Sequence, residues 1–479
     1  MTDPKYLLGD SQVQQFIRDG YIQLEAGFAQ PVHQNIYDAL EEVFEKEGNV
    51  GNNILPRIPQ IKQVFDHPTV SGALISLLGP GYTMNPHRHC HLNPPGGKGQ
   101  TWHKDCYVFD HNTRHPCHHW ILALYYPQDT TEDMGPTGIL PGTHNWEHIS
   151  DPDASQTAED DLSLCGKAGT VTLLHFDAWH RAMANTSTHK RYMLKFQFAR
   201  MQWPPQPTWQ HERDDWQLSQ SANPVESHVW NWLCGRTGLN SVSEPAETVL
   251  SNLDTGSERA RLDAAYALGA QGEDMLPTLL GHLRREAREV EKRIEDKTPD
   301  NAHGTNPTAL RAAQAIESIG PDCTPALLEE LNDPHWLVRA SLCDVIGLWG
   351  SAAGEAVSQI TTLLSDTHWW VRRNAVEGLG RLGDVAGQAL PEMVNTLKDE
   401  DRRVRRAGAI AIAQLAQQGK SLSSAIPSLM TVLSDEDRYN RFYAHLALSR
   451  MKDETAKAAL IDALFTARWC SLTTNENLY

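Results

Sequence analysis

Residues 333–339, Asp-Pro-His-Trp-Leu-Val-Arg, begin a pattern that recurs through the second half of this 479-residue chain. The next copies start at Asp366 (DTHWWVR) and Asp399 (DEDRRVR), each 33 residues after the one before, and a fourth runs from Asp435 to Arg441. Each copy follows an apolar helical run and precedes a run rich in Ala, Leu and Gly. A repeat of this length built from two helices is the signature of an α-solenoid.

The recurring motif also predicts how each repeat is built. We expect its Asp to cap the second helix of the repeat, with the Val and the following Ala and Leu positions facing the stack. The pattern resembles HEAT-type repeats. Weaker copies begin near Ala246 and Pro307, which gives about six helical pairs. The charged segment 284–303 between them is expected to be an insertion on one edge of the stack.

Two features of the repeats leave a binding role open beside a structural one. Trp336, Trp369 and Trp370 fall in the repeat turns and are expected to pack between repeats, with a partner-binding ridge as the alternative. The arginine-rich run 402–406 follows the acidic residues 399–401. It is therefore expected to be a salt-bridged helix start rather than a nucleic-acid patch.

The first half of the chain has a different pattern of helical and strand-like runs, and the pattern changes near residue 240. Helical patterns open it at 10–19, 31–46 and 70–78. Strand-like runs follow at 82–92, 101–109, 120–126, 169–174 and 192–200. Helices followed by many short strands separated by Pro and Gly predict a β-barrel or jelly roll with packed helices. An irregular polar segment, 203–224, then leads to a short helix near 225–234.

These patterns divide the chain into three parts. We expect a barrel domain at residues 1–240, the α-solenoid at 241–472 and a tail at 473–479. The last four residues, Glu-Asn-Leu-Tyr, resemble the start of a viral-protease cleavage site. We therefore expect these four residues to be a tag remnant without a role in the fold.

The composition indicates a cytoplasmic protein. A net charge of −18 argues against a general affinity for nucleic acid, because phosphate binding needs a cationic surface. No apolar run reaches the length of a membrane span, and the N-terminus MTDPKYLLGD lacks the features of a signal peptide. The eight cysteines form no CxxC pair, which favours free thiols over a disulfide framework.

The candidate chemistry of the first half lies in His103, Asp105, His180 and Arg191. Residues two apart on a strand point the same way, so His103 and Asp105 would present an imidazole and a carboxylate to one interior point. His180 follows far enough along the chain to come from another barrel strand. Two histidines and one carboxylate with open positions are the ligand pattern of non-haem Fe(II) oxygenases. The Arg191 guanidinium suits bidentate binding of a co-substrate carboxylate.

Three stretches around these residues resemble a known family. They are 99–105 (GQTWHKD), 135–144 (GPTGILPGTH) and 169–180 (GTVTLLHFDAWH), continuing to Lys190-Arg191. In order and spacing, residues 5–205 resemble the phytanoyl-CoA dioxygenase family of Fe(II)/2-oxoglutarate oxygenases. The resemblance implies a double-stranded β-helix (a cupin-like jelly roll) that uses Fe(II), 2-oxoglutarate and O2. The site residues it implies are His103, Asp105 and His180 for iron, and Arg191, Asn93 and Trp120 for 2-oxoglutarate.

The chain departs from the family pattern at two positions. Ala182 stands where relatives often carry a small hydroxyl, so one hydrogen bond to the co-substrate is expected to be absent. Lys104 replaces the usual Gln or Ser between the first two ligands, and on a strand it should point away from the metal. Relatives that halogenate lack the carboxylate ligand, so Asp105 favours hydroxylation or another oxidation.

Other histidines offer competing sites. His175 and Asp177 form a second HxD pair, but no suitably placed distal histidine with a following Arg comes after them. A cluster with only Cys117 as a sulfur partner does not favour a zinc site, and its histidines are His111, His115, His118 and His119. His87, His89 and His91 alternate along one strand, as substrate contacts or as plain strand surface.

The sequence therefore predicts a dioxygenase that hydroxylates or otherwise oxidises an unactivated C–H bond, with succinate and CO2 as co-products. Its substrate would be a small molecule or a carrier-bound group, and no basic cluster in residues 1–240 marks a site for coenzyme A phosphates. The solenoid could add a protein partner. The alternative is a HEAT-repeat scaffold whose barrel is a sensor or an inactive platform.

Overall fold

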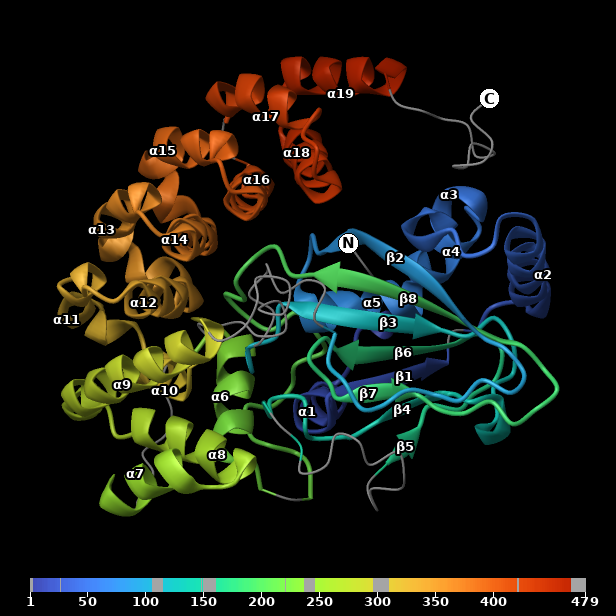
Figure 1. The fold of residues 1–479 in the computed structure, drawn as a ribbon, viewed down its shortest axis with the longest axis horizontal. Coiled ribbons are helices and arrows are strands. Elements are labelled where there is room, and N and C mark those ends of the chain that lie inside the picture. The colour runs from blue at the N-terminus through green and yellow to red at the C-terminus, as the bar shows by residue number, and fades with distance from the viewer. Residues whose placement is uncertain are drawn as a thin grey trace.

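A β-sheet domain and a curved stack of helices make up the computed structural model of the chain (Figure 1). The helices α7 to α19 form an arc around one side of the sheet domain. The structure describes residues 3–25, 27–105, 115–147, 149, 161–219, 221–236, 246–295, 310–419 and 422–466. None of the described helices is both long and apolar enough to cross a membrane.

Among the described residues, five α-helices precede the main strands, and the three that the sequence predicts are confirmed. They are α1 (Asp10–Asp19), α2 (Gln30–Glu47), α3 (Ile54–Arg57), α4 (Ile61–Asp66) and α5 (Pro68–Leu78). Helix α1 ends where Gly20 takes a left-handed conformation with φ of 78°. Helix α5 has Pro68 in its first turn, where a missing N–H costs nothing. The short α3 and α4 have too few residues to show a helical period.

In the described part of the chain, eight strands form two antiparallel sheets. The larger has the order β1-β6-β3-β8-β2 and the smaller the order β5-β4-β7. The strands are β1 (Tyr21–Glu25), β2 (Thr83–Asn93), β3 (Trp120–Tyr125), β4 (Thr137–Ile139), β5 (Leu162–Ser163), β6 (Thr170–His175), β7 (His180–Ala182) and β8 (Arg191–Ala199). Two antiparallel sheets with covering helices agree with the predicted jelly roll.

Strand β3 explains how the larger sheet is buried on both faces. Leu122 and Leu124 belong to a buried cluster with Ile139 of the smaller sheet. Ile121 and Tyr125, which alternate with them, belong to the large cluster that includes the covering helices. The domain therefore has two hydrophobic layers. One lies between the two sheets, and the other lies between the larger sheet and the helices.

The strand predicted at 101–109 does not form in its described part. His103 makes only an isolated antiparallel bridge with His180, and residues 106–109 lie outside the described residues. Strands β1, β4, β5 and β7 were not predicted. They are two to five residues long, which is too short for an alternating pattern to stand out.

Helix α6 (Pro224–Leu233) confirms the short helix expected between the two domains, and paired helices follow it. They are α7 (Ala246–Thr255), α8 (Glu258–Gly269), α9 (Leu276–Glu295), α10 (Arg311–Ile319), α11 (Thr324–Leu327), α12 (Trp336–Leu348), α13 (Val357–Thr362), α14 (Trp369–Leu382), α15 (Leu390–Asn395), α16 (Arg402–Gln417), α17 (Ile426–Val432), α18 (Arg438–Arg450) and α19 (Glu454–Thr466). The second helices pack in series, α12 on α14, α14 on α16 and α16 on α18. The described helices from α7 to α18 form six pairs, in agreement with the predicted number of about six, and α19 ends the described part of the stack.

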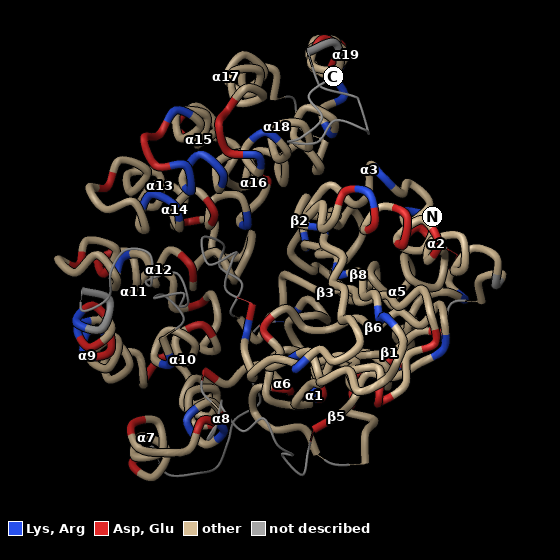
Figure 2. Tube along the Cα trace, turned by 45° about the vertical axis from the view of Figure 1, so that its right-hand side comes forward, with Lys and Arg blue, Asp and Glu red and all other residues tan. Residues whose placement is uncertain are grey.

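The Asp of each repeat motif does not cap its helix directly, which corrects the sequence prediction. The N-cap is the residue two positions later, for example His368 of α14, whose ring accepts a hydrogen bond from Trp370 N. Asp366 instead accepts from His368 N at 2.8 Å and from Arg339 Nε of the preceding repeat at 2.8 Å. Equivalent contacts between repeats join Arg284 to Asp333, Arg372 to Asp399 and Arg405 to Asp435. Figure 2 shows the resulting alternation of basic and acidic segments beside α14 and α16.

The predicted insertion at 284–303 is wrong for its described part. Residues 284–295 continue helix α9, and Arg284 pairs with Asp333 and Glu330 of the next repeat. Residues 296–303 and Pro307 lie outside the described residues. The repeat tryptophans pack between repeats as expected: Trp336 stacks on His368 at 3.9 Å, and the Arg403 guanidinium lies 3.3 Å from the Trp369 ring centre.

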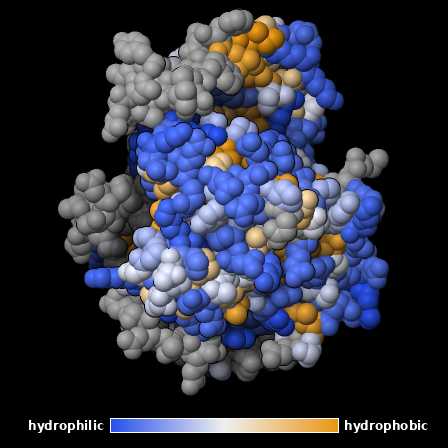
Figure 3. Space-filling view, turned by 90° about the vertical axis from the view of Figure 1, so that its right-hand side faces the viewer, coloured by the Kyte–Doolittle hydropathy of each residue, from blue (hydrophilic) through white to orange (hydrophobic). Residues whose placement is uncertain are grey.

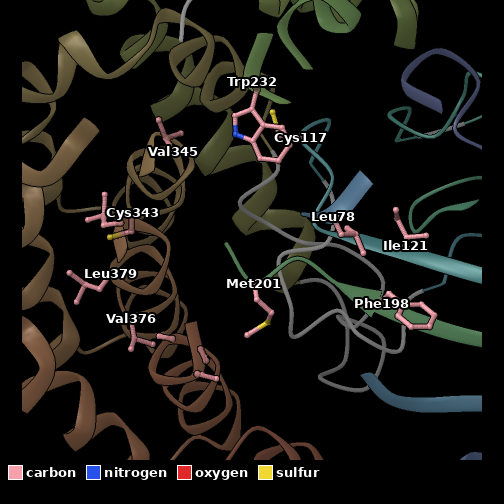
Figure 4. Close-up of a cluster of buried hydrophobic side chains, with 14 of the residues drawn as sticks. Leu78, Cys117, Ile121, Phe198, Met201, Trp232, Cys343, Val345, Val376 and Leu379 are labelled. Carbon is pink, nitrogen blue, oxygen red and sulfur yellow. The ribbon is translucent and has the colours of Figure 1, made fainter. Parts of the chain in front are cut away.

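The barrel and the solenoid share one buried apolar cluster. Figure 4 shows part of it, with Ile121 and Phe198 of the sheet on one side, Cys343 and Leu379 of the solenoid on the other, and Trp232 of α6 in the middle. By contrast, the outer face in Figure 3 is mostly hydrophilic. Hydrophobic atoms gather at its top, where α19 exposes Ile461 and Leu464.

Candidate metal centre

A backbone bridge brings the three candidate ligands together. His103 N donates to His180 O and His180 N donates to His103 O, both at 3.0 Å. This pairing ties the segment that carries His103 and Asp105 to strand β7. The two imidazole rings lie 4.5 Å apart between centres. Ligand atoms of His103, Asp105 and His180 all lie within 4.8 Å of one another.

The two imidazoles are oriented by main-chain carbonyls. His103 Nδ1 lies 2.9 Å from Thr101 O, and His180 Nδ1 lies 3.0 Å from Ala178 O. Each Nδ1 therefore donates, which leaves Nε2 with the lone pair that binds a metal. His180 Nε2 lies 3.7 Å from Asp105 Oδ1. The arrangement presents two imidazole nitrogens and one carboxylate to a common point.

The protonation state of His180 suits metal binding. Burial lowers the pKa of His180 to about 4, although the nearby Asp105 carboxylate acts in the opposite direction. The imidazole is therefore neutral near pH 7, which is the form that coordinates metals.

Lys195 is a site residue that the sequence analysis did not single out. Its Nζ donates to Asp105 Oδ2 at 2.8 Å and to Oδ1 at 3.1 Å, and both side chains are buried. Alternate residues of β8 point to one face of the sheet, so Lys195 lies on the same face as Arg191 and Met193. The alternation of residues along the predicted strand could therefore have placed Lys195 on the cavity side together with Arg191.

Arg191 lines the same cavity as Lys195 and is only 1% exposed. Its Nε and Nη2 donate to Gly135 O at 3.0 and 2.7 Å. Its Nη1 is buried and has no hydrogen-bond partner among the described residues. Burial lowers the pKa of this guanidinium. An arginine side chain nevertheless stays charged in proteins. This nitrogen can therefore donate a hydrogen bond to an anionic ligand in the cavity.

Asn93 pairs with Arg191 across strands β2 and β8. Its Nδ2 donates to Gly135 O at 3.1 Å and to Met183 O at 3.0 Å, so the amide holds the wall of the cavity together. Gly135 has φ of 66°, and a Cβ there would lie 2.5 Å from both Asn93 Nδ2 and Met183 O. Only glycine allows this close approach of three segments.

The cavity that contains these residues has a volume of about 410 Å³. Its lining includes the three candidate ligands, Lys195, Arg191 and Asn93, together with apolar side chains of both sheets. Ala182 also lines it, in agreement with a missing hydroxyl there. Trp120 is not among the lining residues and packs against Phe176 with ring centres 6.2 Å apart. Its position does not favour the co-substrate contact that the family resemblance implied.

The competing HxD pair has a different environment. Lys104 Nζ donates to Asp177 Oδ2 at 2.8 Å and to His144 O at 2.9 Å, so it points away from the candidate centre as expected. Asp177 N donates to His175 Nδ1 at 3.1 Å. Neither His175 nor Asp177 belongs to a metal-binding group of the described residues.

The other histidines of the sheet domain have partners in both domains. His115 pairs with Asp344 of the solenoid at 3.1 Å, and His118 Nε2 lies 3.0 Å from Leu77 O. His119 stacks on Trp203, and His111 lies outside the described residues. On strand β2, His91 lines the cavity, His89 stacks on it at 4.5 Å, and His87 Nδ1 lies 2.9 Å from Tyr439 OH of α18.

Comparisons with known proteins agree with this organisation. Residues 10–193 match the family described as phytanoyl-CoA dioxygenase, and residues 324–413 and 390–469 match HEAT repeats. Both resemblances inferred from the sequence are thereby confirmed. No curated protein matches the chain.

Several solved structures are similar to part of the chain. One is the non-haem alpha-ketoglutarate-dependent carbocyclase SnoK from nogalamycin biosynthesis, at 18% identity over 41% of this chain and 85% of that chain, with a TM-score of 0.34. Another is HygX from Streptomyces hygroscopicus with nickel and 2-oxoglutarate bound, at 13% identity over 40% and 88%, with a TM-score of 0.35. EctD from S. alaskensis in its apo form has 18% identity over 40% and 76%, with a TM-score of 0.35.

Proposed function

We propose that the N-terminal domain, which matches the phytanoyl-CoA dioxygenase family, is an Fe(II)- and 2-oxoglutarate-dependent dioxygenase. The observation that carries the proposal is the convergence of His103, Asp105 and His180 on one cavity, with Arg191 in its wall. The substrate would be a small molecule or a carrier-bound group that is oxidised at an unactivated C–H bond. The presence of Asp105 favours hydroxylation over halogenation.

The residues present fit both groups. Two imidazole nitrogens and one carboxylate suit Fe(II) and leave coordination positions open. 2-Oxoglutarate carries a keto acid at one end, which can chelate iron, and a second carboxylate at the other. The buried Nη1 of Arg191 supplies a charged donor to that second carboxylate. Bound together, iron, 2-oxoglutarate and O2 supply the oxidising chemistry, with succinate and CO2 as co-products.

The chain's own residues would position and protect this chemistry. The carbonyls of Thr101 and Ala178 hold the imidazoles with Nε2 facing inward. Apolar side chains of both sheets, including Leu122 and Leu124, line the cavity and exclude water. The carbonyl of Gly135 fixes the Arg191 guanidinium so that one nitrogen stays available.

An anaerobic titration tests the proposal. Purified protein would be loaded with Fe(II) and then 2-oxoglutarate, while the visible charge-transfer absorption of the chelate is recorded. We expect the band in the wild type, its loss in Asp105→Ala, and at least about a tenfold weaker 2-oxoglutarate affinity in Arg191→Ala. Asp129→Ala, which removes an exposed ion pair away from the cavity, serves as the control. Absence of the band in iron-loaded wild type would overturn the proposal and favour the scaffold alternative.

A further inference from the structure

A second group of metal-binding side chains lies where the barrel meets the solenoid. Cys117 precedes β3, His228 lies on α6 and Glu317 lies on α10. Their ligand atoms all lie within 4.8 Å of one another. The three residues are only 1%, 5% and 4% exposed. Three ligand types from three separate elements thus meet in the interior.

The distances are close to those that a tetrahedral metal needs. With bonds of about 2.0 to 2.3 Å, zinc holds nitrogen, oxygen and sulfur ligands about 3.3 to 3.6 Å apart. His228 Nε2 now lies 2.9 Å from Glu317 Oε1, so a few tenths of an ångström of opening would admit the ion. The sulfur of Cys117 lies within 4.8 Å of the other two ligand atoms, so about an ångström of movement would bring it to that spacing.

A small cavity lies beside the group. It measures about 10 Å³, and its lining includes Cys117, Glu317 and Tyr266. That volume corresponds to about one water-sized sphere, so a single ion or water fits but no organic ligand does. The Tyr266 ring lies 4.8 Å from that of His228, which places its phenol or one water as candidates for a fourth ligand.

The charges of the three ligands would balance those of a divalent cation. On binding, the cation would replace the thiol proton, which leaves to solvent, and the thiolate and carboxylate would balance its two charges. The result is a neutral buried unit, which avoids the cost of an unpaired buried charge.

From this arrangement we infer that Cys117, His228 and Glu317 form a structural zinc site that fastens the solenoid to the barrel. A mixed set of thiolate, imidazole and carboxylate is one that zinc accepts and that magnesium or calcium does not. The site is separate from the candidate iron centre and does not depend on the proposed dioxygenase activity. A metal here would tie three elements that are far apart in the sequence.

Metal content tests the inference directly. The untagged full-length protein would be purified and its zinc measured by mass spectrometry. We expect about one zinc per chain that stays bound in Asp105→Ala and drops at least tenfold in Cys117→Ser. The matched control is Cys343→Ser, since Cys343 is equally buried in α12 but belongs to no metal-binding group of the described residues. Equal zinc in wild type and Cys117→Ser would overturn the inference, because the three residues would then form only a hydrogen bond beside a neutral thiol.

Cobalt substitution tests it without depending on a variant. Co(II) in the site should give a thiolate-to-cobalt charge-transfer band in the near ultraviolet in the wild type. Glu317→Gln keeps the thiolate and should retain the band while weakening cobalt affinity at least tenfold. Absence of the band in cobalt-loaded wild type would overturn the inference even if Cys117→Ser fails to fold.

Discussion

At the scale of single residues, the contact between Lys195 and Asp105 decides how tightly a metal can bind. The ammonium lies 2.8 Å from a carboxylate oxygen that a divalent cation would also need. Replacing Lys195 by Met removes a charge that repels the metal and leaves Asp105 without its ammonium partner. We therefore expect Lys195→Met to raise the affinity for Mn(II) or Fe(II) at least about tenfold, or 1.4 kcal/mol, measured by anaerobic calorimetry.

The same substitution should lower the stability of the metal-free protein by about 3 kcal/mol, since it removes the ammonium partner of the buried Asp105 carboxylate. Lys167→Met is the matched control, because it removes an exposed ammonium from Asp129. Weaker metal binding in Lys195→Met would show instead that the ammonium holds Asp105 in its binding position.

Gly135 links backbone conformation to co-substrate binding. A Cβ at this position would press on Asn93 Nδ2 and Met183 O and move the carbonyl that holds Arg191. We expect Gly135→Ala to weaken 2-oxoglutarate affinity at least tenfold and to cost about 2 kcal/mol of stability. Gly142→Ala is the control, with φ of 73° but no neighbour closer than 3.5 Å. Equal 2-oxoglutarate affinity in the two variants would contradict the role of Gly135.

Buried histidines make the stability depend on pH. Burial lowers the pKa of His118 and of His144 to about 3. Between pH 6.5 and 4 the unfolded chain therefore binds these two protons and the folded chain does not, so stability falls as the pH falls. Each group contributes up to about 1.4 kcal/mol per pH unit, a slope measurable by urea unfolding. His118→Gln should flatten the dependence, and an unchanged slope would contradict this account.

Residue types and spacing were enough to predict the candidate ligands but not their surroundings. The HxD spacing and the distal His180 can be recognised in the sequence because few residue types bind metal ions. Trp120 was placed by family resemblance alone, and its side chain lies outside the cavity lining. Cys117 was set aside with its neighbouring histidines, because its partners His228 and Glu317 lie on elements that no local pattern connects to it.

At the scale of elements, the Arg–Asp contacts between repeats stabilise the solenoid. Arg372 donates through Nε to Asp399 of the next repeat at 2.7 Å and through Nη1 to Asp366 O at 3.1 Å. Both side chains of this pair are largely buried. We expect Arg372→Ala to destabilise the protein by about 2 kcal/mol in urea unfolding. Arg402→Ala, at an exposed position one repeat later, should change stability by less than about 0.5 kcal/mol. Equal losses of stability in the two variants would contradict a stabilising role for the Arg–Asp contacts between repeats.

The sequence predicted long elements well and short or irregular ones poorly. Helices with several turns and strands such as β3 and β8 carry enough residues for a period to be read. Strand β7 has three residues, and its pairing with His103 depends on a contact 77 residues away. The charged part of α9 was misread as an insertion because Arg284 and Glu291 contact the next repeat, which no local pattern shows.

At the scale of the whole molecule, the solenoid covers the edge strand of the larger sheet. Strand β2 ends the sheet, and its Asn85 Nδ2 donates to Tyr443 OH of α18 at 2.8 Å. His87 of the same strand lies 2.9 Å from Tyr439 OH. Gln417 and Arg450 donate to the carbonyls of Pro80 and Gly81 just before the strand. These residues are more than 330 positions apart, so no sequence pattern could predict the contact. The solenoid surface that faces the barrel is therefore partly used within the chain, which weighs against the scaffold alternative.

We call these contacts of residues 80, 81, 85 and 87 with the solenoid the polar seam. The polar seam should make the barrel and the solenoid unfold together. Removing both hydroxyl groups with Tyr439→Phe and Tyr443→Phe leaves the buried Asn85 amide and the His87 ring without these partners at nearly unchanged shape. We expect the wild type to unfold in one calorimetric transition and the double variant to show a lower onset with two resolved transitions. Tyr6→Phe, away from the seam, should behave like the wild type. One unshifted transition in the double variant would show that the apolar cluster around Trp232 couples the domains without the polar seam.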